Sequence, residues 1–198
     1  MRFLRTRRRP RAIARFVVTV LIALVLSGMV TSAVLMLCGT ERWSVKTGTD
    51  GDVGLVDLST AWPETVTDMG NWPRPGSLPS NNRVAPYETT VFLVSATLTE
   101  YKMESDEDYH LVLVDDNGGT MIAEIPAPHC VGNSSPFRDA ITNARAQFDA
   151  VFHVTTSFQH TNTPVLVTGV AFFDFNHGQT GAAPNFIELH PVLDIQFP

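Results

Sequence analysis

The segment from Phe172 to Pro191 brings two carboxylates and two imidazoles close together: Asp174, His177, Glu188 and His190. Carboxylate and imidazole groups bind metal ions and transfer protons. A glycine-containing loop separates the two pairs, and apolar runs typical of buried strands lie on both sides of it. The segment therefore predicts a polar site where two neighbouring strand ends are brought together.

Strand alternation adds two further polar residues to this set. Glu188 and His190 are two positions apart, so they share one face of an expected strand. Glu124 lies between apolar neighbours, where burial of an unpartnered carboxylate would be costly. His110 lies near the start of an earlier expected strand. The candidate cluster, expected to converge at one mouth of a barrel, has six members: His110, Glu124, Asp174, His177, Glu188 and His190.

Three roles are open for this cluster. The first is a structural hydrogen-bond network. The second is a hydrolytic site with a general base or a divalent metal, whose ligands would be Asp174, His177, Glu188 and His190. The third is a ligand-binding site without catalysis. The spacing matches neither His-Glu-x-x-His nor Gly-x-Ser-x-Gly, so no catalytic residue and no cofactor is assigned.

The elements that must position these residues are short strands and one helix. Apolar patterning predicts five strands, over 90–101, 109–114, 120–125, 165–173 and 186–195. The Asn117-Gly118 pair predicts a hairpin after the second strand, because Asn-Gly tolerates positive φ. Between the third and fourth strands, Ser135 and Pro136 suit a helix start, and apolar residues recur at helical spacing from Phe137 to Phe148.

Three strands, one helix and two more strands is the order found in OB-fold barrels. We therefore predict a mainly β (α+β) fold over residues 87–198, an OB-fold-like five-stranded barrel with one helix. A small open sheet with one helix packed on it is the alternative. The preceding residues 39–86 are rich in Pro, Gly, Ser and Asn, which predicts an extended tether with little regular structure.

The charges are segregated along the chain. Seven arginines lie within residues 1–15, whereas every Asp and Glu lies at or after Glu41. The uncharged apolar run 16–38 would span about 35 Å as a helix, enough for a ~30 Å hydrocarbon layer. It predicts a transmembrane anchor with the basic segment in the cytoplasm, and a cleaved signal peptide is the alternative. Both place residues 40–198 outside the cytoplasm.

The two cysteines and one acidic run are expected to play no special part. Because Cys38 ends the apolar run, we expect no disulfide framework and a fold that rests on its hydrophobic core. Cys130 is then a buried or half-buried free thiol. The acidic residues 104–108 are expected to form a solvated turn.

Several phrases of the chain occur in the same order in a group of bacterial proteins. They are WSVKTGTD from Trp43, VAPYETTV from Val84, LTEYK from Leu98, DEDYHLVL from Asp106, TMIAEIP from Thr120, FFDFNHGQTG from Phe172 and IELHPVL from Ile187. On these phrases the chain resembles uncharacterised bacterial proteins that are secreted or membrane-anchored. The resemblance implies a location in the bacterial envelope and lends no mechanism.

The order of elements also resembles staphylococcal nuclease-like barrels, which implies arginines and carboxylates around calcium. After Val84, however, the chain contains three basic residues, Lys102, Arg138 and Arg145. So few cations would leave a phosphate transition state without stabilisation, and the acidic charge of this part disfavours nucleic acid as a partner.

These observations favour a membrane-tethered, extracytoplasmic β-barrel domain that binds a small ligand or an envelope protein and has no catalysis of its own. The alternative is a metal-dependent hydrolase with a nuclease-like barrel that uses the His/Asp/Glu cluster. A purely structural envelope scaffold is the further alternative.

Overall fold

The computed structural model describes residues 38–198. The basic segment 1–15 and nearly all of the expected transmembrane segment 16–38 lie outside these residues. Within the described part of the chain, no helix is both long and apolar enough to cross a membrane.

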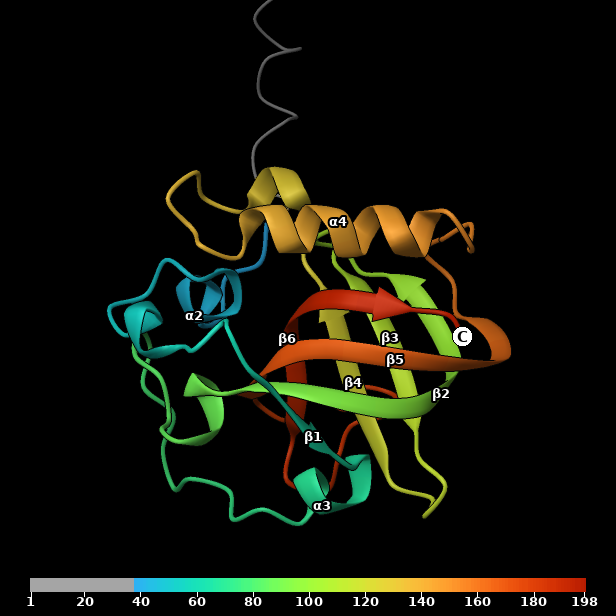
Figure 1. Ribbon diagram of the computed structural model, residues 1–198, viewed down its shortest axis with the longest axis horizontal. Helices are drawn as coiled ribbons and strands as arrows, with labels where there is room; N and C mark the ends of the chain where they lie inside the picture. Colours follow the sequence, from blue (N-terminus) through green and yellow to red (C-terminus); the bar gives the residue numbers. More distant parts are fainter. Residues whose placement is uncertain (1–37) are drawn as a thin grey trace, which may run out of the picture. The chain divides into compact units, whose positions relative to one another are not determined.

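The described residues form a mainly β structure with one six-stranded sheet and few helices (Figure 1). The strands are β1 (Ala61–Glu64), β2 (Val91–Met103), β3 (Tyr109–Val114), β4 (Thr120–Ile125), β5 (Gln159–Phe173) and β6 (Ile187–Gln196). The α-helices are α2 (Trp43–Thr47), α3 (Val66–Gly70) and α4 (Arg138–Asp149). Short 3-10 helices are η1 (Val53–Leu55), η2 (Tyr87–Thr89) and η3 (Pro128–Cys130).

The sheet has the order β1-β2-β3-β4-β6-β5, and β2 also pairs with β5. The pairings therefore run from β2 through β3, β4, β6 and β5 back to β2. Within this circuit β4 and β6 are parallel, and the other neighbours are antiparallel. The prediction of a mainly β, α+β fold with strands at these places is confirmed, and β1, which pairs in parallel with the start of β2, is an addition.

Strand β5 begins six positions earlier than predicted. The prediction missed these positions because the first part of the strand is half-exposed. Residues 159–164 alternate between partly buried and exposed positions, so they lack the apolar run that marks the later half. They are nevertheless paired with the far end of β2. Backbone hydrogen bonds rather than side-chain burial define this part of the strand.

Helix α4 closes the hydrophobic core at one end of the strands, as Figure 1 shows. The four residues at predicted helical spacing, Phe137, Ile141, Ala144 and Phe148, are all fully buried. Phe148 packs against Tyr101 and Tyr109, which come from β2 and β3. Full burial of each large apolar side chain stabilises the fold by about 1.5–3 kcal/mol relative to exposure. The predicted helix and its core-facing side are confirmed, but its predicted start at Ser135 and Pro136 is wrong, because α4 begins at Arg138 with Phe137 as its N-cap.

Residues 39–86 are not an extended tether, because they contain α2, β1 and α3 and pack on the sheet. Arg42 is buried and donates from Nη1 and Nη2 to the two carboxylate oxygens of Glu88, both at 2.7 Å, and to the carbonyl oxygen of Phe173 at 2.9 Å. Arg83 and Asp50 form a second buried ion pair at 2.7 Å. The Pro and Gly content limits the length of regular elements here but does not prevent packing.

Cys38 and Cys130 form a disulfide, so the expectations of no disulfide and of a free thiol at Cys130 are wrong. The two residues are 92 positions apart in sequence. The sequence did not indicate this disulfide, because the two cysteines meet only where the fold brings η3 beside Cys38. This covalent link adds to the hydrophobic core in holding the segment before α2 in place.

Candidate functional site

Strand register places three of the predicted site residues in one row. His110 on β3 is the direct partner of Glu124 on β4. The parallel pairing of β4 with β6 sets Ile122 beside Glu188, so Glu124 lies level with His190. Alternation puts Leu111, Ala123 and Leu189 into the hydrophobic core, and the polar row therefore lies on the opposite face. The sequence predicted a cluster at one mouth of a barrel. The cluster lies instead on this outer face of the sheet.

His190 is the centre of the buried part of the cluster and has no exposed surface. Its Nδ1 lies 3.0 Å from Glu124 Oε2 and 3.1 Å from Glu188 Oε1. Its Nε2 lies 3.6 Å from Asp108 Oδ2. On the other side, His110 Nδ1 lies 3.3 Å from Glu124 Oε1. Glu124 thus joins two imidazoles, and four of the six predicted residues form one continuous network.

Two segments cover this outer face and explain its burial. The loop after β5 passes over β3, where a Cβ at Gly181 (φ +84) would approach Val112 Cγ1 to 2.5 Å, so the close approach needs glycine. From the other side, α2 contributes Lys46, whose Nζ lies 3.7 Å from Asp174 Oδ2 and 5.2 Å from the centre of the Phe172 ring. Lys46 was missed because its segment was expected to be a tether.

The buried charges adjust one another's protonation. Burial raises the pKa of Glu188 to about 7, and the charges of Asp174 and Glu124 add to this rise. Burial and the charge of Lys46 act to lower the pKa of His190, but Glu124 and Asp108 outweigh them and hold it well above its usual value. The result is an imidazolium held among carboxylates, with Glu188 titrating near neutral pH.

The pKa of Glu124 is lowered, whereas that of Lys46 is raised. Burial would raise the pKa of Glu124, but the charge of His190 and the hydrogen bond with His110 hold it well below its usual range. Burial would likewise lower the pKa of Lys46, yet the carboxylates around it, with Glu188 and Glu124 the strongest, raise it above its ordinary value. Glu124 is therefore anionic and Lys46 cationic at neutral pH.

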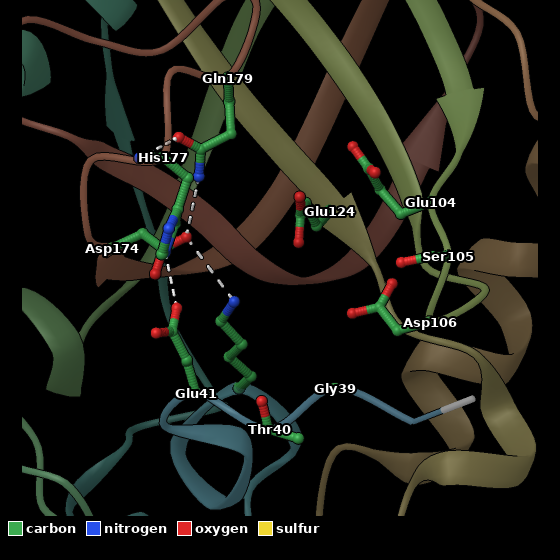
Figure 2. A pocket seen from close by; sticks show the side chains of 11 residues that line it. Gly39, Thr40, Glu41, Glu104, Ser105, Asp106, Glu124, Asp174, His177 and Gln179 are labelled. Atoms are coloured by element: carbon green, nitrogen blue, oxygen red, sulfur yellow. Dashed lines mark hydrogen bonds and ion pairs between the residues drawn. The ribbon is translucent and has the colours of Figure 1, made fainter. Parts of the chain in front are cut away.

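Above this network lies an acidic pocket of about 330 Å³. Figure 2 shows Glu41, Asp174 and His177 on one wall, Glu104 and Asp106 on the other, and Glu124 between them. Lys46 also lines the pocket. Five carboxylates thus face one lysine and one histidine, so the pocket carries net negative charge. Glu188 and His190 lie outside its lining.

The acidic run 104–108 is not simply a solvated turn. Glu104 and Asp106 line the pocket, and Asp108 is buried, with its Oδ1 accepting a hydrogen bond from the backbone N–H of Ala127 at 2.9 Å. Asp108 lies two positions before His110, so alternation already placed both on one face. That spacing was the signal that could have added Asp108 to the candidate set.

The four predicted metal ligands are divided between two groups. Asp174 and His177 lie with Glu41, while His190 lies with Asp108 and Glu124, and in each group the candidate ligand atoms are within 4.8 Å of one another. Glu188 contacts His190. His177 is half-exposed and pairs with Glu41 at 2.6 Å, so it takes no part in the buried network.

Comparison with known proteins returns no match to any protein-family model and no match to any curated protein. The class of protein is therefore defined by the structure itself: a mainly β domain whose sheet carries a covered polar network and an acidic pocket.

Proposed function

We propose that this chain is a membrane-tethered, extracytoplasmic binding protein whose β domain takes a small cationic ligand into the acidic pocket. The observation that carries the proposal is the excess of carboxylates over cationic side chains in a pocket of about 330 Å³. That volume lies within the range of small-molecule sites.

An OB-fold-like barrel is the architecture we assign to β2–β6. The pairings among these five strands return to their start, and α4 lies between the third and fourth of them in sequence. Both features support a closed five-stranded barrel of OB type. In this assignment the pocket lies outside the barrel wall, between the sheet and the segment that follows Cys38.

The location outside the cytoplasm is supported by three observations. An uncharged apolar run follows seven arginines at the N-terminus. The Cys38–Cys130 disulfide suits an oxidising compartment. The resemblance to bacterial secreted or membrane-anchored proteins points the same way.

Charge selects the class of ligand. A unit cation about 4 Å from one carboxylate gains roughly 1 kcal/mol at the dielectric of water and about 4 kcal/mol at an effective value of 20. The opposing walls, with Glu41 and Asp174 on one and Glu104 and Asp106 on the other, let one ligand contact several carboxylates (Figure 2). Phosphates and nucleic acids would be repelled by the same groups.

Burial favours binding without turnover. Glu188 and His190 have the perturbed protonation that suits proton transfer, but they are 2% and 0% exposed and do not line the pocket. A general base must reach the proton that it abstracts. The network therefore serves best to hold Glu124 and Lys46 in position under the ligand.

A metal-dependent hydrolase is the second candidate, and the position of Lys46 favours it. Lys46 Nζ lies 3.7 Å from Asp174 in an open pocket, where an ammonium group can stabilise developing negative charge. Turnover of ester or phosphodiester substrates by the full chain with added metal, lost in Asp174→Asn, would establish this candidate in place of simple binding.

The binding proposal is tested with the full chain in a mild detergent. Calorimetry with putrescine, spermidine, lysine and arginine is expected to show saturable binding that weakens with salt. The double variant Glu104→Gln/Asp106→Asn should weaken it at least tenfold, whereas Glu100→Gln, a matched acid outside the pocket, should not. Absence of saturable binding for these amines and for divalent metals, or equal binding by the double variant, would overturn the proposal.

A further inference from the structure

We propose that Glu41, Asp174 and His177 bind one divalent transition-metal ion where the acidic pocket meets solvent. Candidate ligand atoms from these three side chains lie within 4.8 Å of one another. This inference rests on the proposed function, because it names the class of cation for the same pocket. It differs from the sequence expectation, in which Glu188 and His190 completed the set.

The first argument is an unused oxygen on Asp174. This residue is 6% exposed, and among residues 38–198 its Oδ1 finds no hydrogen-bond partner. A buried carboxylate oxygen without a partner destabilises the fold, because it has lost its hydrogen bonds to water and gained none in return. Asp174 lines the pocket, so a cation there would satisfy the oxygen.

The second argument is that the other carboxylate oxygen of Asp174, Oδ2, already has partners. Its Oδ2 accepts a hydrogen bond from Gln179 Nε2 at 3.3 Å and lies 3.7 Å from Lys46 Nζ. Metal-binding carboxylates are oriented in this way, with a second layer of partners fixing the oxygen that does not coordinate. The contact with Lys46 leaves Oδ1 free to coordinate.

Gln179 also positions the second ligand. Its Oε1 accepts a hydrogen bond from the backbone N–H of His177 at 2.9 Å. Gly178, at φ +72, lets the chain turn between these two residues. One amide side chain thus holds the carboxylate of Asp174 and the backbone of His177 in the same loop. Gln179 is a positioning residue for the proposed site.

The remaining ligand, Glu41, contacts His177 directly, and both side chains can move. His177 Nε2 and Glu41 Oε2 lie 2.6 Å apart, closer than two ligands of one zinc ion, which at about 2.0–2.2 Å from the metal stand roughly 3.3 Å from each other. The two side chains are 45% and 51% exposed, so a small rotation about their outer bonds separates them at little cost. The ion would then replace their direct contact.

The donor set indicates the kind of metal. One imidazole nitrogen with two carboxylates suits Zn²⁺ or Mn²⁺, whereas Ca²⁺ and Mg²⁺ prefer sites made of oxygen alone. The nearby Glu104, Asp106 and Glu124 add negative charge that offsets the repulsion from Lys46. A three-ligand site also leaves a coordination position open towards the pocket.

The test is zinc calorimetry on the full chain in mild detergent, after treatment with chelator and desalting. We expect one equivalent of Zn²⁺ to bind, with affinity at least tenfold lower in Asp174→Asn and His177→Gln and roughly tenfold lower in Gln179→Ala. The matched control is His160→Gln. His160 forms a similar exposed pair with Glu100 at 3.4 Å, and its loss should change nothing.

The decisive variant is His177→Gln, because His177 is half-exposed and its loss leaves the fold intact. Failure of zinc to bind in a stoichiometric amount, or equal affinity in this variant, overturns the metal site. The proposed function still stands in that case if amines bind saturably and lose affinity in Glu104→Gln/Asp106→Asn. If amines and zinc both fail, both proposals fall.

Discussion

Replacing Glu188 by Gln should change how the stability of the domain depends on pH. Burial raises the pKa of Glu188 from 4.5 to about 7. At about 1.4 kcal/mol for each pH unit, ionisation of this side chain costs the folded state about 3 kcal/mol. Glutamine keeps the shape of the side chain and cannot ionise, so the variant does not bear this cost.

The sign of this pH dependence follows from which state, folded or unfolded, binds the Glu188 proton more tightly. The folded chain binds the Glu188 proton more strongly than the unfolded chain does, so the unfolded state loses it first as pH rises. The stability contributed by this proton is complete below pH 4.5 and is lost as pH rises through about 7. Relative to wild type, Glu188→Gln should therefore gain about 3 kcal/mol between pH 4 and pH 8.

Urea denaturation of the full chain in mild detergent, followed by tryptophan fluorescence at pH 4, 5, 6, 7 and 8, measures this difference. Trp72 packs against Tyr87 and Phe92 and reports on the folded state. The matched control is Glu100→Gln on β2, which removes a carboxylate that pairs with His160 and not with the buried network. A difference between Glu188→Gln and wild type that stays constant with pH, or that changes no more than in this control, would refute the reasoning, because it would mean that Glu188 ionises freely in the folded protein.

Two further predictions concern the segment before β2. Glu88→Ala leaves Arg42 buried without its carboxylate and should destabilise the domain by about 3–5 kcal/mol in urea titrations, whereas Lys102→Ala, which removes a partly exposed pair, should cost at most about 1 kcal/mol. Equal effects would mean that the Arg42–Glu88 pair is not buried in solution. Replacing Cys38 and Cys130 by Ser opens a link across 92 positions and should cost about 4.6 kcal/mol by the loop-entropy relation. An unchanged denaturation midpoint would contradict the disulfide.

Much of the sheet was predictable because local patterns describe it. Strands β3 and β4 have the bounds that apolar patterning predicted. The residues from Phe137 to Phe148 at helical spacing face the core. Alternation also placed Glu188 and His190 on one face, where they are in contact. Each of these inferences depends on residues close together in sequence.

The outer face of the sheet was not predictable in the same way. The sequence indicated that Glu124 needed a partner but not which one. The answer depends on the register of two strand pairings. His110 is paired with Glu124 across the β3–β4 hairpin, whereas Ile122 is paired with Glu188 between strands far apart in sequence. Lys46 was overlooked because the Pro and Gly content of residues 39–86 indicates only that regular elements there are short. It does not indicate which part of the sheet those elements pack against.

The sequence by itself thus determined strands β2–β6, helix α4, their core-facing positions and most of the polar residues, because periodicity and turn chemistry are local. Only the tertiary structure decided that Asp174 and His177 part from Glu188 and His190, that Lys46 lies among the carboxylates, and that the acidic residues 104 and 106 face a pocket. The physical reason is that charges interact through space. Their partners are set by strand register and by the packing of residues 39–86, which no local pattern encodes.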